Sequence, residues 1–261
     1  MLTPLARSDT RTVRMLGLNY AKHAKESNLP IPTYPVLFYK PVTSLAGPFS
    51  PIPVHPIAQE APASIDYECE LVAVIGKEVR DVSEENALDY VLGYAVGNDV
   101  SHREWQLKRG GGTSLSPCPP FLAHPLFFFL SPKSFTYVFS GQWSLGKHFD
   151  AWSPFGPGIV STSLVRNPQK LKISTKVNGE TVQSGETSDM IFSIAKTIAF
   201  LSQGNTLLPG DLIWTGTPAG VGMGRNPQVW LKDGDVVEVA LEGVGSCTNK
   251  VEFDKGPRAK L

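Results

Sequence analysis

Residues 65–76 read IDYECELVAVIG, and the pattern of this stretch decides the fold class. Its positions alternate, its last residues are β-branched and Gly76 closes it, so it predicts a strand. Residues 93–100 (GYAVGNDV) predict a second strand a short distance along the chain. Between them, Ser83 followed by two glutamates predicts a helix that ends near Leu92, because acidic side chains are favoured in a first helical turn.

The rest of the chain predicts further short strands and few helices. Asn178-Gly179 predicts a tight turn that joins residues 171–177 to residues 180–183 in a hairpin. Residues 188–201 place apolar side chains on one face of a helix. Residues 29–53 are rich in proline and predict an extended, looping segment. Other strands are predicted at residues 13–20, 211–214, 236–241 and 248–253, and one or two helical turns at residues 21–27.

Composition indicates the same fold class. The 24 glycines and 22 prolines make up about 18 % of the 261 residues, above the usual ~12 %. Such a chain is rich in turns, and it lacks the long helices that alternate with strands in a doubly wound parallel sheet. We therefore expect an α+β, mainly β architecture in a single domain over residues 1–261, with its core at about residues 13–253.

Charge and hydropathy exclude several functional classes. Lys and Arg together number 24, as do Asp and Glu, so no basic field would attract nucleic acid. No apolar run approaches the ~18 residues that span a bilayer, so we expect no membrane partner. The three cysteines show no paired spacing, which disfavours a disulfide framework or a zinc site. We expect a cytoplasmic protein, with a short mitochondrial presequence as the alternative.

Three carboxylates form a candidate metal site. Glu68 and Glu70 are two apart in a predicted strand, so both project onto one face. Two like charges this close are unfavourable unless a cation neutralises them. Asp99 ends the next predicted strand, and three carboxylate oxygens suit Mg²⁺ or Mn²⁺ better than zinc. The alternative is an exposed strand edge with solvated acids.

His23 and Glu26 form a candidate acid–base pair. They are three apart on a predicted helical turn, so they share a face and can hydrogen-bond. A carboxylate that holds an imidazole orients it and raises its basicity, which is the arrangement that a general base needs. The alternative is a surface pair between Lys22 and Lys25.

Other polar residues could face the same site. Arg103 and Gln106 follow Asp99 within one or two helical turns. The glycine-rich stretch 215–224 is neither a dinucleotide fingerprint nor a P-loop, but its backbone N–H groups and the Thr217 hydroxyl could hold a substrate carboxylate. No G-x-S-x-G elbow occurs, so a serine nucleophile is disfavoured.

Several stretches, taken in order, resemble the fumarylacetoacetate hydrolase family. Among them are GLNYAKHAKE (17–26), FYKP (38–41), DYECELVAVIGK (66–77), GYAVGNDVSHREWQ (93–106), LGKHFD (145–150) and LLPGDLIWTGTPAGVG (207–222). The resemblance covers nearly the whole chain except residues 113–140 and the two ends. It implies a mixed β-roll or β-sandwich catalytic fold, a few short helices and a homodimer.

The resemblance also implies a role for each candidate residue. Glu68, Glu70 and Asp99 match the ligands of Mg²⁺ (or Mn²⁺ or Ca²⁺). His23 and Glu26 match a catalytic dyad on a lid helix, and Lys147 matches a lysine that contacts the substrate oxygen. Arg103, Gln106 and Thr217 match residues that bind the substrate.

The implied activity is metal-dependent hydrolysis of a C–C bond in a 2-oxo or 1,3-dicarbonyl acid such as an acylpyruvate, through a stabilised enolate. The same site could serve an oxaloacetate decarboxylase or a 2-oxo acid hydratase or isomerase, because a fold does not choose between chemistries. The non-enzymatic alternative is a degenerate family member that acts as a binding dimer.

Residues 113–140 depart from the family pattern. These 28 residues contain six of the 13 phenylalanines and a single charged side chain, Lys133. Structureless loops beyond ~12–15 residues are uncommon in compact domains. We interpret the segment as an atypical insertion, either a gene-model error such as a translated intron or a partner-binding loop. In both cases we expect it to project without regular structure and its ends to lie close together. In a protein made with this segment, misplaced Arg103, Gln106 and Lys147 and a low activity are the expectation.

Overall fold

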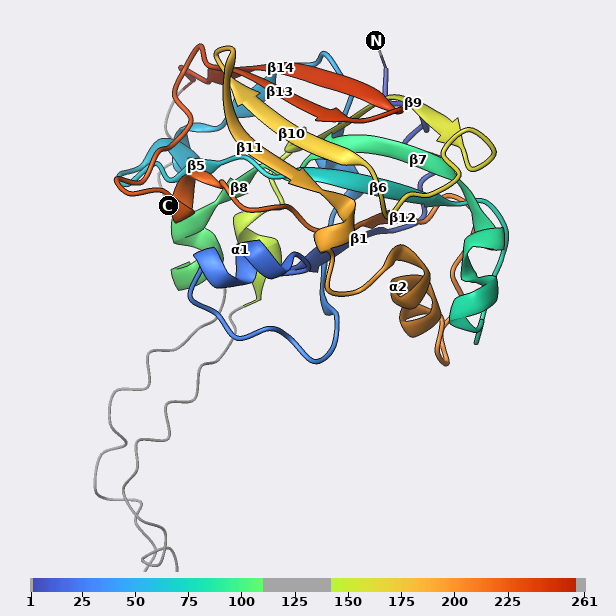
Figure 1. The fold of residues 1–261 in the computed structure, drawn as a ribbon. Coiled ribbons are helices and arrows are strands. Elements are labelled where there is room, and N and C mark those ends of the chain that lie inside the picture. The colour runs from blue at the N-terminus through green and yellow to red at the C-terminus, as the bar shows by residue number, and fades with distance from the viewer. Residues whose placement is uncertain (1, 110–141, 257–261) are drawn as a thin grey trace, which may run out of the picture.

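The computed structural model describes residues 2–109 and 142–256, and its β-strands form two main layers (Figure 1). The larger sheet has seven strands in the order β2-β1-β12-β6-β7-β9-β3. Their bounds are β1 Val13–Gly17, β2 Val36–Lys40, β3 Leu45–Ala46, β6 Cys69–Ile75, β7 Val91–Asn98, β9 Ser153–Ser161 and β12 Leu212–Trp214. Most neighbours are antiparallel, whereas β1 runs parallel to β12 and β3 runs parallel to β9. The expected mainly β fold is confirmed.

The second layer is a five-stranded sheet in the order β11-β10-β13-β14-β4. Its strands are β4 Ile52–Val54, β10 Lys172–Val177, β11 Glu180–Glu186, β13 Val236–Leu241 and β14 Gly245–Phe253. The predicted hairpin joins β10 to β11. Asn178 and Gly179 have φ angles of +52° and +84°, as a two-residue hairpin turn requires.

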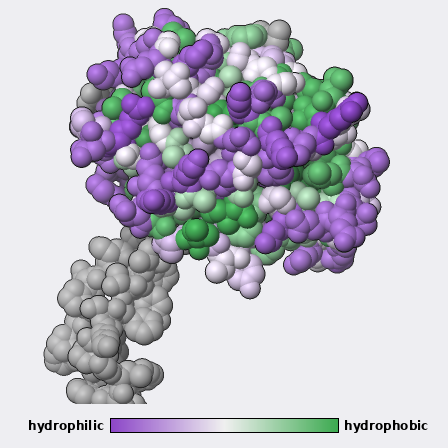
Figure 2. Space-filling model, in the orientation of Figure 1, coloured by the Kyte–Doolittle hydropathy of each residue, from purple (hydrophilic) through white to green (hydrophobic). Residues whose placement is uncertain are grey.

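The helices are short and lie outside the layers. The α-helices are α1 Ala21–Glu26 and α2 Ile194–Leu201, both on the lower side of Figure 1. Hydrophilic residues cover much of the face seen in Figure 2, and a hydrophobic patch lies at its lower edge near α1. Among the described residues, the 3₁₀ turns are Val42–Ser44, Pro56–Gln59, Glu84–Tyr90, Trp143–Gly146, Thr187–Asp189 and Gly222–Gly224, and a π-helical turn spans Trp105–Arg109.

The main hydrophobic core fills the space between the two sheets. Leu71, Ala73 and Ile75 of β6 face this core, together with Val237 and Val239 of β13. The intervening β6 side chains face a second, smaller core on the other side of the seven-stranded sheet, with members Val72, Val74, Phe38 and Trp214. Because side chains alternate along a strand, Glu70 belongs to that second side, and the candidate site forms there.

Several predicted boundaries were wrong. The strand expected at 65–76 is divided into β5 Ile65–Asp66 and β6. Between them the backbone N–H groups bond to side chains instead of to a neighbouring strand. The Tyr67 N–H donates to the Asp66 carboxylate, and the Glu68 N–H donates to the Asn98 side chain. β5 pairs with β8, Ser101–His102, in a two-stranded sheet.

Two helical predictions and one loop prediction also need correction. The helix expected to end near Leu92 is a 3₁₀ segment that ends at Tyr90, and β7 begins at the next residue. α2 starts at Ile194 rather than 188, because the Ser193 hydroxyl accepts the Lys196 N–H and caps the helix there. The segment expected to loop over residues 29–53 contains strands β2, β3 and β4.

Candidate active site

The carboxylates of Glu68, Glu70 and Asp99 converge at one end of the β6–β7 pair. Glu70 lies near the start of β6, Glu68 just before it, and Asp99 just after β7. These two strands are antiparallel, so the start of one meets the end of the other, and the Asp99 N–H donates to the Glu68 carbonyl at 2.8 Å. One oxygen from each carboxylate lies within 4.8 Å of the others, and all three residues are buried.

Glu70 shows that this cluster suits a cation. Its Oε2 accepts the Gly216 N–H at 2.8 Å, whereas Oε1 is buried without a hydrogen-bond partner in the described part of the chain. Burial and the charges of Asp99 and Glu68 raise the pKa of Glu70 well above its usual range. Three hard oxygen ligands and a buried orphan oxygen fit a divalent cation such as Mg²⁺.

Two buried lysines contact both oxygens of Asp99 and one oxygen of Glu68. Lys147 Nζ donates to Glu68 Oε2 at 3.0 Å and to Asp99 Oδ2 at 2.6 Å. Lys40 Nζ donates to Asp99 Oδ1 at 2.8 Å. Burial lowers the pKa of Lys40; for Lys147 the attraction of Asp99 and Glu68 outweighs burial, so its pKa is raised. The resemblance predicted Lys147 at the substrate, and the structure places it against two candidate ligands.

Lys40 was not foreseen. It lies on β2, where Phe38 and Lys40 are buried and Leu37 and Tyr39 are exposed. The sequence of β2, VLFYK, shows no alternation of polar and apolar side chains, so the inward side of this strand, and with it Lys40, is identified only by the structure.

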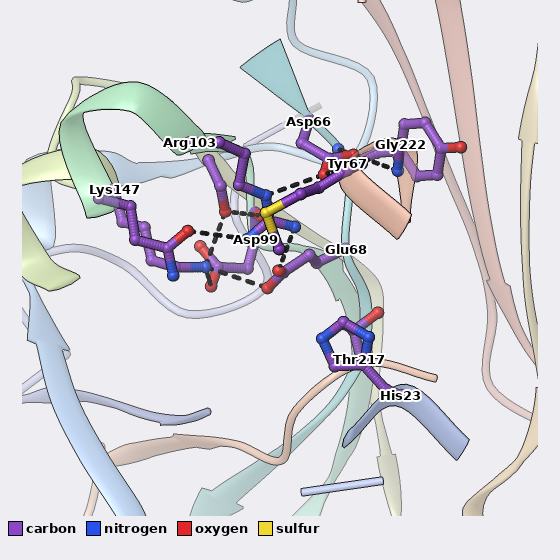
Figure 3. Close-up of polar contacts among 12 residues, drawn as sticks. His23, Asp66, Tyr67, Glu68, Asp99, Arg103, Lys147, Thr217 and Gly222 are labelled. Carbon is purple, nitrogen blue, oxygen red and sulfur yellow. Dashed lines mark hydrogen bonds and ion pairs between the residues drawn. The ribbon is translucent and has the colours of Figure 1, made fainter. Parts of the chain in front are cut away.

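Arg103 reaches Glu68 from another side than Lys147 does (Figure 3). Its Nη2 lies 2.6 Å from Glu68 Oε1, and its Nη1 donates to Gln106 Oε1 at 2.9 Å. Its Nε donates to Asp66 Oδ2 at 2.8 Å. Burial by itself lowers the pKa of Arg103, but the charges of Glu68 and Asp66 raise it by more, so the net shift is upward. Sequence analysis missed Asp66, although it lies two residues before Glu68, with the same spacing as Glu68 and Glu70.

The predicted pair on α1 is present. His23 Nδ1 lies 3.3 Å from Glu26 Oε2, and His23 is 5 % exposed. The Glu26 oxygens also accept the Gly220 N–H at 3.0 and 3.1 Å. The carboxylate therefore joins the histidine to the glycine-rich loop.

Thr217 lies on that loop and is held by Gln183 of β11. Gln183 Nε2 donates to Thr217 Oγ1 at 2.9 Å, while its Oε1 accepts the Cys69 N–H at 3.1 Å. Sequence analysis did not single out Gln183. The N–H groups of Gly216 and Gly220 on this loop donate to the protein's own carboxylates, so these two are engaged within the chain; the role of Thr217 at a substrate carboxylate stays a prediction.

These side chains surround a pocket with a volume of about 50 Å³, which is room for a few water molecules. Its polar lining is His23, Ser27, Glu68, Arg103, Gln106, Lys147 and Thr217, and its apolar lining includes Leu18, Leu29, Phe38, Leu107, Trp143 and Met223. The Trp143 ring packs on Gly17, where a side chain would overlap it.

The segments that flank the predicted insertion meet at this pocket. A Cβ on Gly146 would lie 2.6 Å from the Gln106 Cα, so the turns before residue 110 and after residue 141 touch. Arg103, Gln106 and Lys147 consequently share one pocket, contrary to the concern that an insertion would misplace them. The predictions about residues 113–140 themselves lie outside the described residues.

Known proteins are similar to this chain over nearly its whole length. The sequence model described as fumarylacetoacetate (FAA) hydrolase C-terminal matches residues 12–132 and 129–252. Oxaloacetate tautomerase FAHD2A, mitochondrial, from Homo sapiens is 40 % identical over 250 residues, which cover 96 % of this chain and 68 % of the relative. Oxaloacetate tautomerase fahd2, mitochondrial, from Xenopus laevis is 37 % identical over 251 residues, with the same coverage of 96 % and 68 %.

Solved structures are also similar to this chain over nearly its whole length. Fumarylacetoacetate hydrolase from Exiguobacterium antarcticum superposes with a TM-score of 0.77 at 36 % identity, covering 97 % of this chain and 78 % of that one. The 2-hydroxyhepta-2,4-diene-1,7-dioate isomerase from Mycobacterium marinum superposes with a TM-score of 0.73 at 34 % identity, covering 98 % and 78 %. Among the described residues, no helix is both long and apolar enough to cross a membrane.

Proposed function

Because the chain belongs to the fumarylacetoacetate hydrolase family, whose members process 2-oxo acids, we propose that it is a divalent-metal-dependent enzyme that enolises such an acid, with keto–enol tautomerisation of oxaloacetate as its reaction. The relatives from Homo sapiens and Xenopus laevis are named for this activity. The observation that carries the proposal is the buried acidic triad, whose member Glu68 lines one pocket together with His23 and Lys147.

The charge of the site supports an anionic substrate bound with a divalent cation. Four buried carboxylates (Asp66, Glu68, Glu70 and Asp99) face three buried cations (Lys40, Arg103 and Lys147). With every group ionised, the protein contributes one excess negative charge. A divalent cation makes the excess one positive charge, which one carboxylate of a 2-oxo acid balances; the second carboxylate of oxaloacetate adds one further negative charge.

The cation and the side chains of the site would have separate roles in the reaction. When bound, the cation supplies Lewis acidity that polarises the 2-oxo carbonyl and acidifies the neighbouring C3–H. His23, oriented by Glu26, removes the C3 proton. The electron pair of the C–H bond becomes the C2=C3 double bond, the carbonyl π pair moves to oxygen, and that oxygen takes a proton from water. Protonated His23 then returns the C3 proton to the hydroxide that remains, so the site ends as it began. Lys147, whose raised pKa keeps it charged, stabilises the developing oxyanion.

Hydrolysis of an acylpyruvate is the second candidate, and the His23–Glu26 pair favours it. The same imidazole would take a proton from water, which attacks the distal carbonyl and releases the enolate. Decarboxylation would form the same enolate by loss of CO₂ without water attack. The complete set of acidic and basic residues disfavours a purely binding dimer.

A substrate panel tests the proposal. Oxaloacetate and a short 2,4-dioxo acid are assayed with Mg²⁺ and then with EDTA, against Mg²⁺ in buffer alone. We expect enzyme-dependent enol–keto interconversion that EDTA abolishes and that His23→Ala lowers by roughly 10²–10⁴-fold. Lys25→Ala, an exposed position on the same helix, is the matched control. Equal turnover with and without metal would refute metal dependence, and full activity of His23→Ala would refute the assigned base.

We propose a homodimer located in mitochondria, rather than the cytoplasmic location favoured by the sequence. The support for the location is the word mitochondrial in the names of the relatives, and the homodimer rests on the family resemblance alone. A carboxy-terminal fluorescent fusion that fills the cytosol would contradict the location, and a monomeric mass in solution would contradict the dimer.

A further inference from the structure

The glycine-rich loop donates its backbone N–H groups to carboxylates that come from three other parts of the chain. Gly216 donates to Glu70 Oε2 at 2.8 Å, and Gly220 donates to both oxygens of Glu26. Farther along the loop, the N–H groups of residues 222 and 223 donate to Asp66 at 2.7 and 3.0 Å (Figure 3).

We infer that this loop is a positioning element, which orients the acidic side chains of the site through its backbone. The inference rests on the proposed function and deepens it. Glu70 is a candidate metal ligand, Glu26 orients the candidate base, and Asp66 holds Arg103. Hydrogen bonds from N–H groups to carboxylates are among the stronger ones, and they fix a charged group without adding a titratable partner. The loop thereby holds together groups that β5, β6 and α1 supply separately.

Glu26 depends on the loop most clearly. Its side chain is 20 % exposed, so water can compete for it, unlike the fully buried Glu70. Its hydrogen-bond partners in the described part of the chain are His23 and the Gly220 N–H. Without the loop, the carboxylate could rotate toward solvent and leave the imidazole without orientation.

Gly224 provides a way to disturb Glu26, because the three atoms nearest to a Cβ placed there all belong to that side chain. A Cβ at this position would overlap the Glu26 Cδ and lie 2.8 Å from its Oε1. The backbone at Gly224 lies outside the positive-φ region, so alanine can adopt it, and its N–H keeps the Val221 carbonyl as partner. Gly220 is less suitable, because its φ of +104° would strain any other residue.

A double-substitution cycle tests the inference. Wild type, Gly224→Ala, Glu26→Ala and the double variant are compared for kcat, KM, Mg²⁺ affinity by calorimetry and metal-free Tm. Gly158→Ala is the control, since a Cβ there meets no atom within 4 Å and its backbone also lies outside the positive-φ region. Loss of an orienting contact typically costs about 10–100-fold, so we expect Gly224→Ala to lower kcat by that factor.

The effect should vanish when Glu26 is absent. In the Glu26→Ala background we expect Gly224→Ala to change kcat less than about twofold, because the two substitutions act through one contact. The Tm should fall by about 2–4 °C in the wild-type background and not in the Glu26→Ala background. Mg²⁺ affinity should stay within about twofold of wild type, because the contact that perturbs Glu26 leaves the triad untouched.

Equal losses of kcat or Tm in both backgrounds, or no loss in the wild type, would overturn the inference. If wild type turns over none of the 2-oxo acids, the proposed function fails, and the Tm cycle still decides whether Gly224 acts through Glu26.

Discussion

Replacing Glu70 by glutamine should stabilise the metal-free protein while removing its high-affinity binding of Mg²⁺. Glu70 is 0 % exposed, and its carboxylate lies within 4.8 Å of Glu68 and Asp99. Two like charges at that distance repel by about 3.5 kcal/mol at an effective dielectric constant of about 20. Lys147 and the Gly216 N–H offset part of this repulsion. Glutamine keeps the volume and an acceptor for Gly216, so we expect a net gain of about 1–2 kcal/mol at pH 8.

The gain should depend on pH. Burial, Asp99 and Glu68 raise the pKa of Glu70 in the folded state above its ordinary value of 4.5, so the folded protein binds this proton more tightly than the unfolded chain does. Stability is therefore lost as the pH rises from about 4.5 through the folded-state pKa, by up to about 1.4 kcal/mol per pH unit. Glu70→Gln has no proton to lose at this position and should lack this slope.

Urea unfolding in EDTA at pH 6 and pH 8.5 measures the difference, and calorimetric titration with Mg²⁺ measures the lost affinity. Glu180→Gln is the matched control, because Glu180 lies exposed on β11. A Glu70→Gln protein that is less stable than wild type at pH 8.5, or that shows the same pH slope, would refute the reasoning.

Three further substitutions test other parts of the structure. Lys40→Met leaves Asp99 Oδ1 without its lysine and should cost about 3 kcal/mol in urea unfolding of the metal-free protein; a loss below about 1 kcal/mol would contradict this. Asp66→Asn cannot accept hydrogen bonds from both Arg103 and the loop, so KM for the 2-oxo acid should rise about tenfold, and an unchanged KM would count against it. Asn178→Ala places a residue without a polar side chain at φ +52° and should lower stability by about 1–2 kcal/mol, read from the urea midpoint; a change below 0.5 kcal/mol would be inconsistent with the turn.

Features that depend on neighbours in the sequence could be predicted. The hairpin of β10 and β11 follows from Asn178-Gly179, because positive φ at both turn residues is a local requirement. Glu68 and Glu70 share a side because they are two apart. The pairing of β6 with the adjacent β7 then brings Asp99 to them.

Features that depend on partners far away in the sequence could not be predicted. β4 pairs with Val251–Phe253 and β3 pairs with Ser153–Pro154, so residues 29–53 carry no local sign of their strands. In the site, Lys40 and Asp99 are 59 positions apart, and Gln183 and Cys69 are 114 apart. A buried polar residue of this kind is recognised only when its partners are in place.

Deuterium exchange at C3 of the substrate tests the central claim most directly. Purified protein is mixed with oxaloacetate and Mg²⁺ in D₂O, and the C3 protons are followed by proton NMR against the same mixture without protein. We predict exchange that is proportional to enzyme concentration, that stops with EDTA and that falls to the buffer rate in Glu70→Ala. Exchange at the buffer rate with wild-type protein and Mg²⁺ would contradict the account.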